Sequence, residues 1–340
     1  MTTAWCLSVF IWVVALACTP PDSSSATPAD TEDTQETGET GETGETSDDT
    51  GTPEDTAEPV KSDWSWPVPS DPENGFRLND TFGPRIQSSS GRYDFHRGID
   101  IARDVGTELV AVADGEVTIA GEHPSYTDTT VQIRHTLKDG TYLISHYTHL
   151  SSVAKELKVG DMVSRDEPIG QTGEGSGFPH LHFELRASDT GSSYQRNAVH
   201  PLSYLPYSNA GPPAVSIDEV SRVDDSHIRV DLTLATPGDE ADLLLVTIAV
   251  HDASDESLLS EHRYHINEWN AAHETTSDLD EDVVDSVYFA PAEFHDEKSQ
   301  WVLAMSFLEL EAPAGTSLSV QVTAEDALEE QTTISTSVTP

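Results

Sequence analysis

Short runs of strand-forming residues, separated by turn residues, fill the chain from about Trp64 onward. Apolar and β-branched runs bounded by Gly, Pro, Asp and Asn are typical of β-strands. No long segment has the apolar spacing of a helix, and at most a turn or two of helix is expected between Ser152 and Leu157. The sequence therefore predicts a mainly β protein with antiparallel sheets.

A turn-rich break at Tyr207 to Pro213 divides these runs into two groups, and a chain of 340 residues is long enough for two modest cores. The first group predicts a compact antiparallel β domain over residues 62–208. The second, over residues 213–340, has the strand spacing of an immunoglobulin-like β-sandwich. We expect this module to bind an unidentified partner or to act as a spacer. The expected strands are 108–112, 116–120, 131–134, 141–147 and 180–186, then 215–220, 227–234, 243–251, 301–310 and 317–323.

Residues 1–18 have the pattern of an export signal. Their apolar run, Cys6 to Ala17, is shorter than the roughly 20 residues that a membrane-spanning helix needs. The end of the run, Ala15-Leu16-Ala17-Cys18, resembles a bacterial lipobox, which predicts lipidation of Cys18 and anchoring to the bacterial envelope, at its outer membrane. The same residues also fit an ordinary A-x-A cleavage site, which predicts secretion instead. Because Cys6 precedes either cleavage point, the mature chain could form no internal disulfide.

Residues 19–61 form an acidic segment rich in Thr, Glu and Gly, with almost no apolar side chains. Such a segment cannot bury enough surface to offset its ordering entropy, so we expect a disordered tether. The whole chain has 17 Lys and Arg against 61 Asp and Glu, a formal net charge of -44. This charge opposes binding to phosphate backbones, and we expect no nucleic-acid partner.

Three short motifs in the first group carry histidines and a carboxylate: FHRGID, HYTHLS and PHLHFE. His180 and His182 are two apart on an expected strand, so their side chains face the same side and address one site. Two polar residues on a solvent face would give the same alternation. Gly98, between His96 and Asp100, permits a tight bend or a close backbone approach that brings these two side chains together.

The parity of an extended strand predicts the orientation of a further histidine. His146 and His149 are three apart, so on one continuous strand they would point to opposite faces. We therefore expect His146 to face away from the site that His149 joins.

The motifs H-x-G-x-D, Y-x-H-L-S and P-H-L-H-F-E, in this order, resemble those of the M23 peptidase family, also called the LytM or lysostaphin-like family. The surrounding segments Thr81 to Arg85, Val112 to Gly115 and Val159 to Asp161 are similar to other motifs of that family. The resemblance covers about Trp64 to Tyr207. It implies a LytM-like β domain with a zinc-binding groove.

The resemblance also implies the roles of five residues. His96, Asp100 and His182 would bind one Zn²⁺ per chain, and His149 and His180 would be unliganded catalytic histidines. Two imidazoles and one carboxylate leave a fourth position on zinc for water, which is typical of a catalytic site. We expect His180 to act as the base and His149 to stabilise the oxyanion, although spacing alone leaves these two roles open.

The function implied is a zinc metalloendopeptidase that hydrolyses the stem peptides or cross-bridges of peptidoglycan. The alternative is a non-catalytic LytM-like regulator or wall-binding protein that activates other wall hydrolases. The presence of all five residues favours the enzyme, because a regulator has no chemical use for them.

Overall fold

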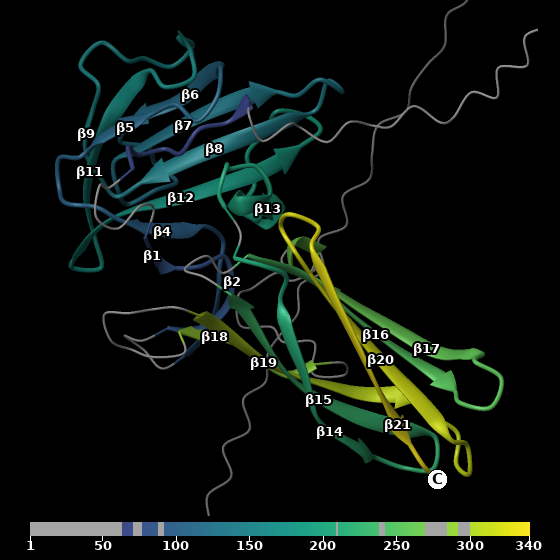
Figure 1. Ribbon diagram of the computed structural model, residues 1–340. Helices are drawn as coiled ribbons and strands as arrows, with labels where there is room; N and C mark the ends of the chain where they lie inside the picture. Colours follow the sequence, from purple (N-terminus) through teal and green to yellow (C-terminus); the bar gives the residue numbers. More distant parts are fainter. Residues whose placement is uncertain are drawn as a thin grey trace, which may run out of the picture. The chain divides into compact units, whose positions relative to one another are not determined.

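The computed structural model describes residues 63–70, 77–87, 92–208, 210–237, 242–268, 284–291 and 300–340. Their regular structure is almost entirely β, with strands that pair mostly antiparallel (Figure 1). This confirms the expected fold class. The predicted signal segment with Cys18 and the acidic tether lie outside the described residues. Within the described part of the chain, no helix is long and apolar enough to cross a membrane.

An 11-stranded sheet holds most of the candidate site residues. Within this sheet, β12 (Phe178–Ser188) lies between β4 (Ile99–Ala102) and β8 (Tyr142–Thr148), and its Leu181, Phe183 and Leu185 are fully buried in the apolar core. His180 and His182 point to the other face, as the alternation predicted. The main path of the sheet runs β1 (Leu78–Asp80), β4, β12, β8, β7 (Thr130–Thr136), β6 (Gly115–Gly121) and β10 (Met162–Val163), with β11 (Pro168–Gly175), β5 (Glu108–Val110), β9 (Leu150–Val153) and β13 (Ala198–Val199) off this path.

The helical turn expected between Ser152 and Leu157 is wrong. Residues up to Val153 belong to β9, which pairs with β11, and a turn follows. The Ala154 amide donates to the Ile169 carbonyl at 2.9 Å, and the Leu157 amide donates to the Ala154 carbonyl at 3.0 Å, which closes a single turn rather than a helix.

Two further sheets contain the strands of the C-terminal region. Alternate residues of β15 and β16 are buried, and both sets belong to one apolar cluster, as in a two-layer sandwich. One sheet has the order β14 (Ala214–Arg222), β15 (His227–Pro237), β19 (Gln300–Glu311), β18 (Val284–Pro291), β2 (Gly83–Gln87) and β3 (Arg92–His96), and the other has β17 (Leu258–His265), β16 (Leu243–Asp252), β20 (Leu318–Asp326) and β21 (Gln331–Val338).

One sheet combines strands from both halves of the described chain. β2 pairs in parallel with β18, at Arg85 and Phe289. In addition, the Tyr207 hydroxyl donates a hydrogen bond of 2.8 Å to the Asp242 carboxylate. The boundary between residues 62–208 and 213–340 stays a prediction. The β2–β18 pairing joins strands that lie on opposite sides of this boundary in the sequence.

His135, which lies on β7, is a buried histidine of the core rather than a site residue. Its Nδ1–H donates to the Asp114 carbonyl and its Nε2 accepts from the Ser145 hydroxyl, both at 2.8 Å. The ring is 2% exposed, and burial lowers its pKa from 6.5 to about 4. The neutral ring is therefore the form that the fold accommodates.

This burial predicts acid sensitivity of the fold. Between pH 6.5 and 4 the unfolded chain binds the proton of His135 and the folded chain does not, so stability is present above pH 6.5 and is lost as the pH falls. The shift corresponds to about 3 kcal/mol of unfolding free energy. We expect His135→Gln to flatten this part of the curve in urea unfolding measured at several pH values. An equal slope in both proteins would contradict the assignment.

Candidate metal centre

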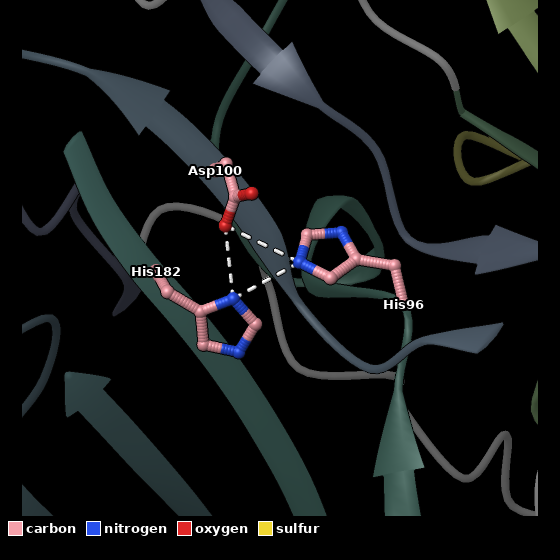
Figure 2. Close-up of side chains that lie close together, drawn as sticks. All are labelled: His96, Asp100 and His182. Atoms are coloured by element: carbon pink, nitrogen blue, oxygen red, sulfur yellow. Dashed lines mark hydrogen bonds and ion pairs between the residues drawn. The ribbon is translucent and has the colours of Figure 1, made fainter. Parts of the chain in front are cut away.

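Three residues from three strands converge at one point. His96 ends β3, Asp100 lies on β4, and His182 lies on β12 directly opposite Asp100 in the strand register. The Asp100 Oδ1 atom is 2.9 Å from His182 Nδ1 and 3.2 Å from His96 Nε2. The two imidazole nitrogens are 3.0 Å apart, and Figure 2 shows the resulting triangle. The structure therefore brings together the three predicted ligands, which form a group able to hold a metal ion.

The remaining ring nitrogens are engaged elsewhere. His96 Nδ1–H donates to the Thr81 carbonyl at 2.8 Å, and His182 Nε2–H donates to the Glu184 carboxylate at 2.9 Å. These bonds fix both tautomers and leave one lone pair on each ring, directed at the other ring and at Asp100. Facing lone pairs beside a carboxylate require a proton or a cation between them. In protein metal sites, each ligating histidine usually donates its other ring N–H to a carboxylate or a backbone carbonyl, as both histidines do here.

The electrostatics of the cluster favour a positive charge. Burial alone would raise the pKa of Asp100, but His96 and His182 outweigh burial and lower that pKa well below its ordinary value. Burial opposes protonation of His182, but its bonds to Asp100 and Glu184 outweigh burial and raise its pKa to about 10. The carboxylates that stabilise a proton here would also stabilise a bound cation.

Gly98 makes the convergence possible by close approach. A Cβ at Gly98 would overlap the Phe183 carbonyl oxygen and come within 2.9 Å of Glu184 Cγ. No left-handed backbone angle is involved at this position. Both uses expected for this glycine are present, because Gly98 is also a bend between the end of β3 and the start of β4.

Glu184 is a site residue that the sequence reasoning missed. It is 5% exposed and accepts from His182 and, at 2.7 Å, from Nε of the fully buried Arg186. Burial would raise the pKa of Glu184, but Arg186 and His182 lower it strongly. The signal was available, because residue 184 continues the alternation of His180 and His182 on one face of β12.

We expect Glu184→Gln to weaken metal binding. The amide would carry no charge toward His182 and would leave Arg186 without its buried counter-ion. Removing such an outer partner typically costs about 10- to 100-fold in metal affinity. Competition with a chromophoric chelator measures this, and circular dichroism checks the fold. Glu174→Gln, at an exposed position on β11, is the matched control. Equal affinity in the Glu184 variant and the wild type would exclude this role.

His180 lies beside the three ligands with one nitrogen available. Its Nδ1–H donates to the Phe178 carbonyl at 2.9 Å, which leaves a lone pair on Nε2. That Nε2 atom is 3.8 Å from Asp100 Oδ1. The ring is 8% exposed, so it is largely enclosed yet adjacent to the candidate metal position.

His149 completes the set from outside the strands. It lies between β8 and β9 with a left-handed φ of 62°, and its ring centroid is 4.9 Å from that of His180. A Cβ at Gly175 would overlap the His149 ring, so only glycine fits there. Burial and the neighbouring His182 and His180 lower the pKa of His149. The structure thus brings all five predicted residues together.

The expectation for His146 is wrong. His146 is the cross-strand partner of Glu184, so it lies on the same face of the sheet as the site. The parity argument assumed one continuous strand through His149, whereas β8 ends at Thr148 and His149 turns out of it. His146 packs on Tyr126 and bonds to Gln132 at 3.2 Å, and it is not part of the three-residue metal group.

Comparisons with known proteins show similarity over the part of the chain that carries this site. The model of peptidase family M23 matches residues 94–200. The murein hydrolase activator NlpD of Escherichia coli is 32% identical over 155 residues, which is 44% of this chain and 33% of NlpD. The DD-carboxypeptidase/endopeptidase Mpg of Neisseria meningitidis is 34% identical over 110 residues, 32% of this chain and 24% of Mpg. The chain thus spans a third or less of the length of these relatives.

A solved structure is also similar. The catalytic domain of the antimicrobial peptidase lysostaphin from Staphylococcus simulans is 27% identical, with a TM-score of 0.32 over 37% of this chain and 90% of that domain.

The described site is therefore an antiparallel β domain that gathers two imidazoles, one carboxylate and two further histidines. Residues 94–200 belong to peptidase family M23, and the predicted LytM-like resemblance is confirmed.

Proposed function

We propose that the chain is a zinc-dependent endopeptidase that hydrolyses peptide bonds in the stem peptides or cross-bridges of peptidoglycan. The observation that carries the proposal is the meeting of five residues at one place. His96, Asp100 and His182 converge on a point, and His149 and His180 stand next to it outside the ligand set.

The donor set fits Zn²⁺. With metal–ligand bonds near 2.05 Å, the ligand atoms of a tetrahedral zinc site are about 3.3 Å apart. The three separations here, 2.9, 3.0 and 3.2 Å, are slightly shorter, so a small outward movement of the side chains would admit the ion. Two neutral imidazoles and one carboxylate also match three-ligand catalytic sites rather than four-ligand structural ones. Bound zinc would supply Lewis acidity toward a peptide carbonyl and toward water.

The unliganded histidines would move the protons. His180 has its Nδ1–H committed to a backbone carbonyl, so its Nε2 can accept the proton of the attacking water. The ring of His149 lies 4.9 Å from that of His180. In its protonated form, with hydrogen on both ring nitrogens, it would donate a hydrogen bond from Nε2 to the oxygen on which charge develops. The enclosure of His180 beside the ligands limits competition from bulk water at that ring.

The substrate class is supported by the relatives. Mpg is named as a carboxypeptidase and endopeptidase, and NlpD as an activator of murein hydrolases. Murein, which is peptidoglycan, stands in the name of NlpD, and the name of Mpg gives a peptide-cleaving activity. For location, we propose export and a lipid anchor on Cys18, with residues 19–61 as a tether and the C-terminal sandwich as a binding or spacing module.

The second candidate is a non-catalytic regulator that activates other wall hydrolases. It is favoured by the similarity to NlpD, which covers more of this chain than the similarity to Mpg. A regulator would bind wall or enzyme through the same domain and would not need a metal.

The test uses the full-length chain. Purified peptidoglycan is incubated with the protein alone, with a chelator, and with the chelator followed by added Zn²⁺, and released fragments are identified by mass spectrometry. We expect cleaved peptides in the first and third samples only. Intact muropeptides in all three would exclude the enzyme for this substrate. Faster release by an added wall hydrolase would then support the regulator.

A further inference from the structure

The backbone of His149 is unusual for a histidine. A left-handed φ of 62° is uncommon for a residue other than glycine and persists only where the surroundings enforce it. It turns the ring out of the register of β8 and β9 and onto Gly175. The position of this ring is therefore set by its neighbours and not by a strand.

Asp128 faces the inner side of the ring. Its Oδ2 atom is 3.1 Å from His149 Nδ1, and that nitrogen is closed to solvent. The two atoms are at ion-pair distance, but the N–H does not point along a hydrogen bond. The Asp128 side chain is 43% exposed and can rotate, so a small change would complete the bond. Catalytic hydrogen bonds are often poorly aligned before substrate binds.

The segment that carries Asp128 is fastened on both sides of His149. The Leu150 amide donates to the Thr129 carbonyl at 3.2 Å. The Thr130 hydroxyl donates to the Asp128 carbonyl at 3.0 Å and lies 3.2 Å from the hydroxyl of Thr148. Both chain neighbours of His149 are thus tied to the residues next to Asp128.

The same segment is also attached to the centre of the sheet. The Tyr126 hydroxyl accepts from the fully buried Arg186 at 2.9 Å, and its ring packs on His146 at a centroid distance of 4.6 Å. These contacts hold the loop that carries Asp128 in a defined position beside His149.

We propose that Asp128 is a positioning residue for His149. Its carboxylate holds the ring in the Nδ1–H tautomer and in one orientation, so that Nε2 is the nitrogen left for substrate. The kinetic consequence rests on the proposed endopeptidase function, whereas the pairing itself does not.

The pairing is tested by NMR on the full-length chain with ¹⁵N-labelled histidine, using His149→Gln to assign the signals. In the wild type we expect His149 to show a protonated Nδ1 and an unprotonated Nε2. Asp128→Ala should convert this to a mixture of tautomers. Asp128→Asn should keep the wild-type pattern, because its amide oxygen can still accept. An unchanged His149 spectrum in Asp128→Ala would overturn the proposal.

The kinetic test measures the rate at which the protein releases dye-labelled fragments from peptidoglycan. Asp128→Ala should slow release by about tenfold or more, a part of the 100- to 10,000-fold that a positioned acid or base contributes. Zinc content should not change, and Asp128→Asn should recover most of the rate. In a His149→Ala background, Asp128→Ala should have no further effect, because residues that act as a unit are not additive.

These outcomes separate the two proposals. Additive losses in the double variant would overturn the positioning role. No release by the wild type would remove the endopeptidase function, and the NMR result would still decide whether Asp128 and His149 form a pair.

Discussion

His180→Ala is expected to lower the rate of peptidoglycan cleavage by about 100- to 10,000-fold while bound zinc stays at about one ion per chain. The loss has this size because a positioned general base typically contributes that factor. Zinc should remain because His180 Nδ1 bonds to the Phe178 carbonyl and the ring is not among the three converging ligands. Metal analysis of the purified variant and fragment release from labelled peptidoglycan measure the two quantities.

The matched control for this change is His251→Ala. His251 is a partly exposed histidine of β16, in a different sheet. Its loss should alter neither zinc content nor rate. If His180→Ala lost its zinc, His180 would be a ligand and the allocation of the two histidines of the H-x-H motif would have to be reversed.

Asp100→Asn is expected to remove the metal. The Asp100 carboxylate is the one charged donor of the triangle and touches both imidazoles. An amide keeps the volume and loses the charge, so the site would hold two neutral rings around a cation. We expect a fall in zinc affinity larger than the about 10- to 100-fold that loss of an outer partner costs, and cleavage should disappear with the metal.

Asp104→Asn tests whether any lost carboxylate has this effect. Asp104 is exposed and follows β4 in the chain, only four residues from Asp100. Its replacement should leave zinc binding unchanged. Zinc content near one ion per chain in Asp100→Asn would contradict the ligand set.

The sequence predicted the strands that have a periodic apolar pattern and the site residues that lie in short motifs. The alternation around His180 and His182 predicted a strand with a polar face, and β12 has it. Strand β21 was missed because Gln331–Val338 is rich in Thr and Ser, and its apolar residues are too few to mark a buried face.

The parts of the site that the sequence could not predict depend on local departures from regular structure. The parity of His146 failed because a single residue, His149, leaves the strand direction. Asp128 carries no motif at all, since its place beside His149 comes from the hydrogen bonds that join Thr129 to Leu150 and Thr130 to Thr148. Such contacts join residues about 20 positions apart and leave no periodic trace.

The three converging ligands do not come from one sheet. His96 ends β3, which belongs to the sheet that also contains β14, β15 and β19, whereas Asp100 and His182 lie in the 11-stranded sheet. A bound ion would therefore act as a cross-link between two sheets, and its binding free energy would add to the stability of their junction. In surroundings poor in metal, the junction of the two sheets would lose this stabilisation, and the proposed metal-dependent activity would be lost with it.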